Sequence, residues 1–281
     1  MSEPADPSML ERLLARERAV VGVGLLVLCA LAWIYLLRGA GMPAAAPADP
    51  MAGMDMAGMD MPGMDMSAMA PQPTGWDASL WAITVAMWGA MMVAMMTPSA
   101  APAILLYARV HRHAAAQDHA RGLAPSGVFA AGYLLVWLVF SVGAAVAQWA
   151  LQEAGLVSSG MLSSQSRWLS GGLLIAAGLY QLSPLQTVCL THCRSPAEFL
   201  SRQWRPGRLG ALGLGVQHGA YCVGCCWALM LLLFVGGVMN LAWIAGLTLV
   251  VLAQKLLPGG LWIGRAGGAA LIAWGLWTLF A

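Results

Sequence analysis

Long apolar runs separated by short polar segments dominate the sequence. Runs of about 20 apolar residues, the length that crosses a ~30 Å hydrocarbon layer as a helix, fall at 19–37, 78–98, 127–150, 168–184, 212–235, 239–257 and 261–280. This pattern predicts seven transmembrane helices. Only Pro258, Gly259 and Gly260 separate the last two runs, which predicts a tight helical hairpin. We expect an all-α, polytopic membrane helix bundle.

Composition supports a membrane protein and argues against several classes of function. Hydrophobic residues make up 60% of the 281 residues and charged residues only 9%, whereas soluble domains carry about 25% charged residues. The sequence has no nucleotide-binding fingerprint and no basic patch for nucleic acid, so we expect no nucleic-acid partner. No Asp, Glu, Lys or Arg lies deep within an expected span, where proton-coupled pumps usually keep one. Primary or proton-driven pumping is therefore not supported.

The distribution of cations predicts the orientation of the chain. Short loops rich in Arg and Lys stay on the cytoplasmic side of a membrane. With the N-terminus inside, the outer segments hold only Arg38 and Arg167. The inner segments hold the other twelve cations: Arg12, Arg16, Arg18, Arg109, Arg112, Arg121, Arg194, Arg202, Arg205, Arg208, Lys255 and Arg265. We expect a multi-pass protein of a bacterial inner (cytoplasmic) membrane, with its N-terminus in the cytoplasm.

The chain divides into three expected parts. Residues 1–38 form a cytoplasmic N-terminus and the first transmembrane helix, 39–77 a disordered linker outside the cytoplasm, and 78–281 a six-helix membrane domain. Residues 12–46 also have a basic start and the small residues Ala44, Ala45 and Ala46, as a signal peptide does. Their apolar run is longer than the roughly 7–15 residues usual in such peptides, so we expect an uncleaved anchor.

The linker has an unusual density of methionine. Residues 51–69, MAGMDMAGMDMPGMDMSAM, repeat G-M-D-M and contain Met51, Met54, Met56, Met59, Met61, Met64, Met66 and Met69. The intervening Gly, Pro and Asp keep such a segment from packing on itself. Thiols are at risk in an oxidising compartment, whereas thioether sulfur is a soft, neutral ligand suited to Cu(I). The linker predicts a copper collector outside the cytoplasm, and the alternative is a plain low-complexity spacer.

A second group of methionines lies in the second apolar run, within MWGAMMVAMMTPS. On a helix these residues form two neighbouring rows on one side: Met87, Met91 and Met95, and beside them Met92 and Met96. A column of thioethers would bind Cu(I) without burying negative charge. The alternative is that methionine fills irregular gaps between helices. Pro98 is expected to close or kink the inner end of this helix.

Cysteines and histidines form a third group. QHGAYCVGCCWALM places His218, Cys222 and Cys225 within one narrow helical arc with Cys226 beside it, and CLTHC contains Cys189, His192 and Cys193. Both clusters flank the same inner segment, 185–211, so we expect them to converge near the cytoplasmic face. Thiols hold Cu(I) tightly, and Cys with His also suits tetrahedral Zn(II). The alternative is buried, inert cysteine.

Cysteine and histidine side chains at two other places are not expected to bind metal. Cys29 stands alone in the first run and is expected to be an inert, buried thiol. His111, His113 and His119 belong to a polar segment, 108–125, that we expect to be a solvated loop. Transfer of metal on the cytosolic side is the alternative role for these histidines.

The Met and Cys motifs resemble those of a known family. WGAMMVAMMTPS, CLTHC and GAYCVGCCWALM are similar to motifs of a bacterial family of predicted metal-binding integral membrane proteins, a domain of unknown function some of whose members are labelled copper chaperones. The resemblance covers residues 78–280. It implies that the following residues match the family pattern: Met91, Met92, Met95, Met96, Cys189, Cys193, Cys222, Cys225 and Cys226. The linker lies outside the shared region and resembles Met-rich segments of periplasmic copper-handling proteins.

We favour a Cu(I)-binding membrane protein for copper delivery, uptake or homeostasis, with thioether capture outside and thiol sites inside. Its expected partners are copper ions, the lipid bilayer and a copper donor or acceptor protein, and it is not expected to be an enzyme. Two alternatives stay open. A membrane thiol-disulfide oxidoreductase would use the C-x-x-C of Cys222 and Cys225, with Cys189 and Cys193 as a second pair. A metal-insertion assembly factor would hold a partner subunit while copper is inserted.

Overall fold

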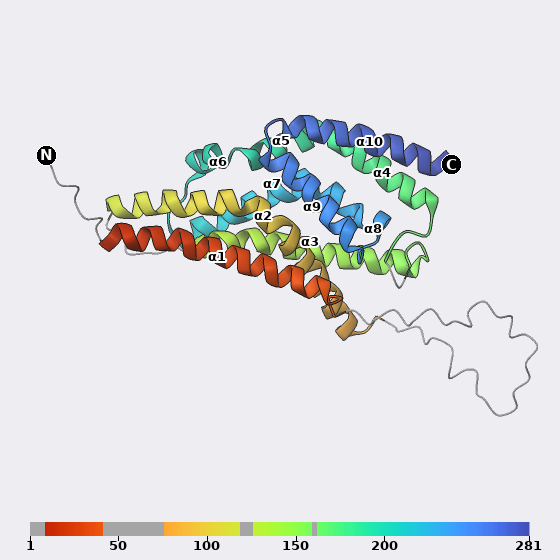
Figure 1. Cartoon of the computed structure of the whole chain (residues 1–281), viewed down its shortest axis with the longest axis horizontal. Coiled ribbons are helices and arrows are strands. Elements are labelled where there is room, and N and C mark those ends of the chain that lie inside the picture. The colour runs from red at the N-terminus through yellow and green to blue at the C-terminus, as the bar shows by residue number, and fades with distance from the viewer. Residues whose placement is uncertain (1–8, 42–75, 119–125, 159–161, 281) are drawn as a thin grey trace, which may run out of the picture.

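The chain folds as a bundle of helices. The computed structural model describes residues 9–41, 76–118, 126–158 and 162–280, which form the elongated bundle in Figure 1. Its elements are α1 (Met9–Leu37), α2 (Ala78–Asp118), α3 (Ser126–Glu153), α4 (Arg167–Leu182), α5 (Pro184–Arg194), α6 (Pro196–Gln203), α7 (Gly207–Leu231), α8 (Leu233–Gly236), α9 (Leu241–Leu256) and α10 (Gly260–Phe280). The expected all-α class is therefore confirmed.

The number of membrane helices differs from the expected seven. Within the described residues, five helical stretches are long and apolar enough to cross a membrane: Ala19–Leu37, Ala78–Val110, Ser126–Glu153, Gly207–Gly236 and Gly260–Phe280. α4 and α5 together make a sixth candidate, although they are bent by 64° at their junction. α9 has only 16 residues, or about 24 Å of helix. The prediction of seven spans is wrong because hydropathy locates an apolar run but not the turns that interrupt or shorten its helix.

The α4–α5 junction shows how one such turn arises. Pro184 has no N–H with which to continue the α4 hydrogen-bond ladder, and Ser183 before it is extended, with φ −73° and ψ 151°. The Ser183 hydroxyl then accepts a hydrogen bond from the Gln186 N–H at 3.2 Å and caps α5. The turn directs α5 along α7, against which it packs.

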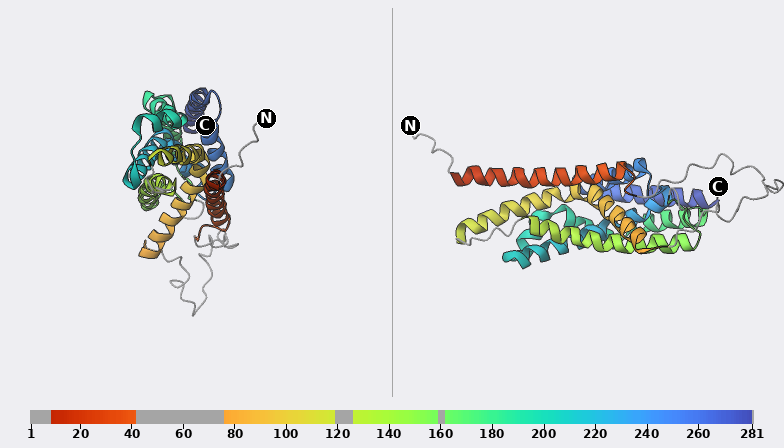
Figure 2. Two further views of the ribbon diagram at one scale, coloured as in Figure 1. Left: turned by 90° about the vertical axis from the view of Figure 1, so that its left-hand side faces the viewer. Right: turned by 90° about the horizontal axis from the view of Figure 1, so that it is seen from below.

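α2 continues beyond the proline that was expected to close or kink it. It is a single helix of 41 residues with Pro98 and Pro102 inside, and Figure 2 shows that it changes direction along its length. Because Pro98 lacks an N–H, the carbonyl oxygen of Ala94 has no helical donor. The thiol of Cys29 on α1 donates to that oxygen at 3.5 Å. Cys29 thus serves the packing of α1 on α2.

Asp77 caps the start of α2. Its carboxylate accepts hydrogen bonds from the Leu80 N–H at 2.8 Å and from the Ser79 hydroxyl at 3.0 Å. These two bonds lower the pKa of the exposed Asp77 carboxyl from its ordinary value. The cap defines the end of α2 from which the methionine column begins.

Glycine lets α3 and α7 pack at backbone contact. A Cβ added to Gly132 of α3 would collide with the carbonyl oxygen of Leu212, and a Cβ on Gly215 of α7 would collide with that of Phe129. Small residues permit this approach in membrane bundles, where packing rather than water drives helix association. The contact brings the next residue of α3, Tyr133, against α7.

Candidate metal centre

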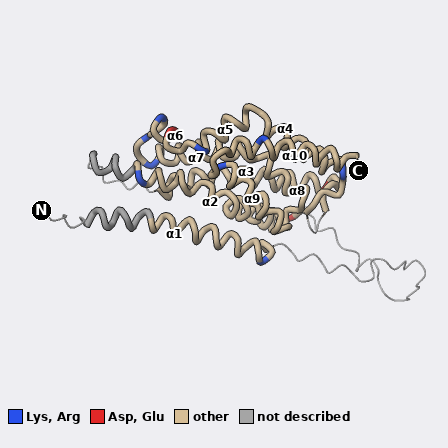
Figure 3. Tube along the Cα trace, turned by 45° about the horizontal axis from the view of Figure 1, so that its top comes forward, with Lys and Arg blue, Asp and Glu red and all other residues tan. Residues whose placement is uncertain are grey.

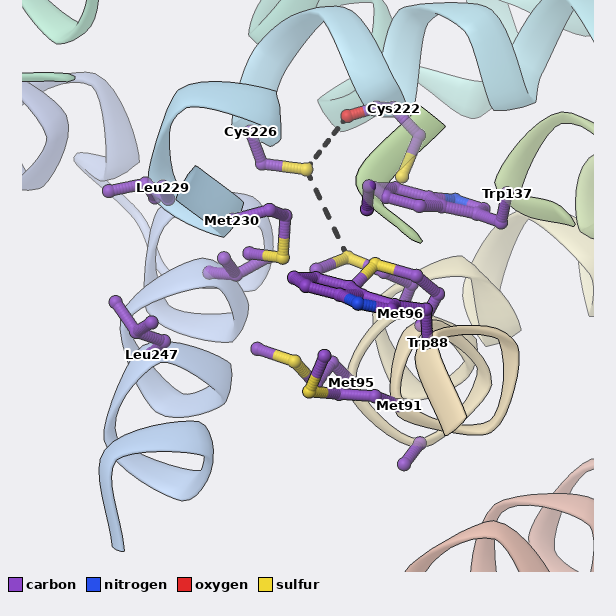
Figure 4. Close-up of a cluster of buried hydrophobic side chains, with 14 of the residues drawn as sticks. Trp88, Met91, Met95, Met96, Trp137, Cys222, Cys226, Leu229, Met230 and Leu247 are labelled. Atoms are coloured by element: carbon purple, nitrogen blue, oxygen red, sulfur yellow. Dashed lines mark hydrogen bonds between the residues drawn. The ribbon is translucent and has the colours of Figure 1, made fainter. Parts of the chain in front are cut away.

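The methionines of α2 lie in the interior of the bundle. Met87, Met91, Met92, Met95 and Met96 are each at most 1% exposed. Figure 4 shows Met91, Met95 and Met96 beside Met230 of α7, whose side chain was not among the expected donors. The thioethers of α2 therefore face a neighbouring helix that also carries sulfur.

Met96 is the point at which the methionines meet the cysteines. Its Sδ lies 3.9 Å from Sγ of Cys226 on α7. The Cys226 thiol in turn donates to the carbonyl oxygen of Cys222 at 2.9 Å. Thioether and thiol sulfur from two different helices thus converge at a buried position, as Figure 4 shows.

Cys222 contacts groups on two other helices. Its Sγ lies 3.1 Å from the hydroxyl of Tyr133 on α3 and 2.9 Å from Nζ of Lys255 on α9. The Tyr133 hydroxyl also donates to the Met96 carbonyl at 3.2 Å, and Lys255 also donates to Ser99 Oγ at 3.3 Å. Cys222 is 2% exposed. Its sulfur is held by groups of α3 and α9, which are themselves hydrogen-bonded to α2.

Lys255 of α9 was not among the expected site residues. Lys255, which we counted among the cations of the inner segments, is only 7% exposed and contacts Cys222. α9 is short and ends at Leu256, and in its last turn Gln254 and Lys255 are buried while Leu256 is 50% exposed. One signal was available: Lys255 is the single lysine of the chain, since the other 13 of its 14 cations are arginines, and it lies in an apolar run without an acidic residue.

Arg194 fixes the end of α9 next to this lysine. The guanidinium of Arg194, the last residue of α5, donates to the carbonyl oxygens of Gln254 and, at 2.8 Å, of Leu257. These carbonyls lie at the C-terminal end of α9, where a cation is favoured by the helix dipole. Arg194 directly follows Cys193, so one short helix carries both a thiol and the group that positions Lys255.

A pair of thiols forms between α5 and α7. Cys225 Sγ is 3.9 Å from Cys193 Sγ of α5, and the Cys225 thiol donates to the Cys222 carbonyl at 3.1 Å. Successive residues are 100° apart around a helix, so Cys225 and Cys226 face different neighbours. Cys189 lies against the face of α7 that carries Gly224, where an added Cβ would be 2.7 Å from the Cys189 sulfur.

The two candidate histidines differ in their surroundings. Nδ1 of His192 is 2.8 Å from the carbonyl oxygen of Val188 and must donate to it, which leaves Nε2 free to accept. The His192 ring also stacks on Tyr221, with centroids 4.4 Å apart. His218 is 3% exposed, and its Nδ1 has no hydrogen-bond partner within the described residues. That unpaired atom is one turn from Cys222.

The donors that converge are sulfur atoms. Among the described residues, no three His, Cys, Asp or Glu side chains are grouped to hold a metal ion, so a closed Cys/His site of the zinc type is not formed there. The contacts found are Met96 with Cys226 and Cys193 with Cys225. Thiolate and thioether ligands select soft ions such as Cu(I), so the donor set fits a copper ion as cargo.

Comparison with known proteins decides the family. A family model described as PpoB2, copper chaperone, matches residues 85–278. The chain belongs to this copper chaperone family. The resemblance seen in the Met and Cys motifs is confirmed, and a copper-related function follows. No curated protein and no solved structure matches the chain significantly.

The copper chaperone segment contains the whole sulfur cluster. Residues 85–278 include the α2 methionines, CLTHC of α5, the α7 cysteines and Lys255. Met51 to Met69 of the linker precede the matched segment and lie outside the described residues. The side chains of His111, His113 and His119 also lie outside the described part of the chain. The roles of these residues stay predictions.

Proposed function

We propose that this copper chaperone binds Cu(I) inside the membrane bundle, at sulfur supplied by α2, α5 and α7. The observation that carries the proposal is the 3.9 Å contact between Met96 Sδ and Cys226 Sγ, which joins the thioether column to the thiols in a water-excluded interior. A soft univalent ion bound there can move from neutral thioether ligands to thiolate ligands, and its ligand atoms remain sulfur throughout. Copper delivery, uptake or homeostasis is the biological role that this chemistry serves.

The order of the donors gives the transfer a direction. Met91 and Met95 precede Met96 along α2. Met96 contacts Cys226 of α7. The neighbouring α7 thiols, Cys222 and Cys225, continue the series to Cys193 of α5. In this proposal the Met-rich linker collects copper outside, the α2 thioethers pass it inward, and the thiols retain it until an acceptor protein takes it. Thioethers bind less tightly than thiolates, so each step leads to a stronger ligand.

The charge distribution supports an inward direction. Figure 3 shows Lys and Arg of the described residues concentrated at the end of the bundle that carries α6. The C-terminal end of α1 and the start of α2, which border the Met-rich linker, lie toward the other end. By the positive-inside rule the α6 end faces the cytoplasm. The protein is accordingly proposed to lie in the inner membrane with its N-terminus inside.

Metal analysis of the full-length protein tests the proposal. The protein is purified without oxygen, exposed to Ag(I) as a redox-inert stand-in for Cu(I), washed with a competing chelator and analysed by mass spectrometry for metal. A variant carrying Cys222→Ser and Cys225→Ser should lose the tightly held ions, while Cys29→Ser, which alters a thiol of α1, should keep them. Equal metal content in the double variant and the wild type would refute binding at this site.

A thiol-disulfide function is the second candidate, because Cys193 and Cys225 are 3.9 Å apart. Two thiols would form one S–S bond and give two electrons and two protons to an acceptor of the quinone class. Assays for bound quinone and for quinone-dependent oxidation separate this function from copper transfer. Oxidation of the pair by a quinone analogue in metal-free protein, with no retention of Ag(I), would favour the oxidoreductase.

A further inference from the structure

Lys255 places a positive charge beside the cysteines without a carboxylate to balance it. Its Nζ contacts Cys222 Sγ at 2.9 Å and Ser99 Oγ at 3.3 Å. In the part of the chain that the structure describes, no carboxylate forms an ion pair with it. A buried charge requires an opposite charge or strong hydrogen bonds nearby. The contacting group that can supply negative charge is the thiolate of Cys222.

The ammonium is held where it is. Ser99 on α2 accepts a hydrogen bond from the Lys255 ammonium. Arg194 donates to the backbone carbonyls of Gln254 and Leu257, which precede and follow Lys255 in the chain. The side chain is only 7% exposed, so it has no short route to water. An ion that enters the site therefore binds next to this charge and cannot displace it into solvent.

We propose that Lys255 is a specificity-determining residue: its positive charge makes the site of Cys222, Cys226 and Met96 selective for univalent over divalent soft ions. The inference rests on the proposed function and concerns the same site. Metal binding requires thiolates, and two thiolates with one ammonium leave one net negative charge. A univalent ion neutralises that charge. A divalent ion leaves one uncompensated positive charge in the interior, which is strongly unfavourable.

The test is a competition between Ag(I) and Cd(II), two soft ions that differ in charge. Full-length protein purified without oxygen is equilibrated with equal concentrations of both, and bound metals are counted by mass spectrometry. The Cys222→Ser variant, measured in parallel, gives the background from other sulfur atoms, including those of the linker. Cadmium–thiolate charge-transfer absorption reports Cd(II) at cysteine independently.

Wild-type protein should take up Ag(I) and almost no Cd(II) at the Cys222-dependent site. Lys255→Met should raise the Cd(II) to Ag(I) ratio by more than about tenfold, because it removes one charge from a poorly solvated site. Lys255→Gln, a neutral side chain that can still hydrogen-bond, should shift the ratio in the same direction, and Lys255→Arg should retain the wild-type ratio. Size-exclusion chromatography checks that each variant is folded.

Three results would overturn the inference. They are equal uptake of Cd(II) and Ag(I) by the wild type, an unchanged ratio in both neutral variants, and a shift in Lys255→Arg as large as that in Lys255→Met. The proposed function fails in a different way, since then the wild type would bind no Cys222-dependent Ag(I) at all. Measurement of Ag(I) alone separates these two failures.

Discussion

Arg194 at the end of α5 donates a hydrogen bond to the carbonyl oxygen of Gln254, the residue before Lys255 on α9. This contact joins the helix of the CLTHC motif to the helix that carries the buried ammonium. Cys193 precedes Arg194 and contacts Cys225, while Lys255 contacts Cys222. The two ends of the thiol cluster are thereby tied through α5 and α9.

Replacing Arg194 should loosen this tie. In Arg194→Gln the carbonyls of Gln254 and Leu257 lose charged donors, which should lower the free energy of unfolding by about 1–3 kcal/mol and raise the rate of Cys222 alkylation. Thermal denaturation in detergent and alkylation followed by mass spectrometry measure the two effects. Arg202→Gln is the matched control, because Arg202 is 76% exposed and pairs with Glu198 of its own helix. Equal effects in both variants would contradict a role for the α5–α9 contact.

Met96→Leu should weaken metal binding while preserving the fold. Leucine has a similar volume, so the change should cost less than about 1.5 kcal/mol of stability, but it removes the sulfur that contacts Cys226. We expect weaker retention of Ag(I) against a chelator. The control is Met239→Leu, in the short connection between α8 and α9, which removes a thioether that is not a candidate donor. Unchanged retention in Met96→Leu would argue that the column does not reach the thiols.

Metal should protect one thiol pair from oxidation. Because Cys193 and Cys225 lie 3.9 Å apart on different helices, a mild oxidant should join them as a disulfide in metal-free protein, with only a small local adjustment. Prior loading with Ag(I) should prevent the bond. Mass spectrometry of unreduced peptides identifies the linkage, and Cys225→Ser is the negative control. The prediction fails if the disulfide forms equally with and without bound Ag(I).

Two glycines of α7 should respond oppositely to alanine. A Cβ at Gly215 collides with the Phe129 carbonyl of α3, whereas a Cβ at Gly213 meets nothing within 4 Å. Gly215→Ala should separate α3 from α7 and destabilise the protein by about 1–3 kcal/mol. Gly213→Ala should be neutral or stabilising, by up to about 1 kcal/mol. Melting temperatures in one detergent provide the comparison, and a stabilised Gly215→Ala would contradict the close contact.

Parts of the site could be predicted from local sequence. The spacing of Met91 and Met95 by one helical turn predicted that they share one side of a helix, and both are fully buried. The CLTHC and CVGCC motifs resembled a copper chaperone family, and the family match confirms this. These inferences succeeded because helical periodicity and motif identity depend on neighbours in the chain.

Other parts depend on contacts between distant residues. The expected arc of Cys222 and Cys225 did not reveal that Cys225 faces Cys193 while Cys222 faces Lys255, because an arc gives directions around one helix but not the identity of the neighbours. The expected fourth run ended at residue 184, where α4 gives way to α5, but the inner segment that follows was not expected to form the helices α5 and α6. A proline either lies inside a helix that continues past it, as Pro98 does, or directly follows the end of a helix, as Pro184 does, and the surrounding packing decides between them.

The sequence by itself determined that this protein is helical and apolar enough for a membrane, and that its Met and Cys motifs belong to a copper chaperone family. Only the tertiary structure decided which sulfur atoms meet and that the single lysine lies among them. The physical reason is that apolar burial and helix formation follow from local periodicity, whereas the charge and donor set of a buried site are assembled from helices distant in the chain.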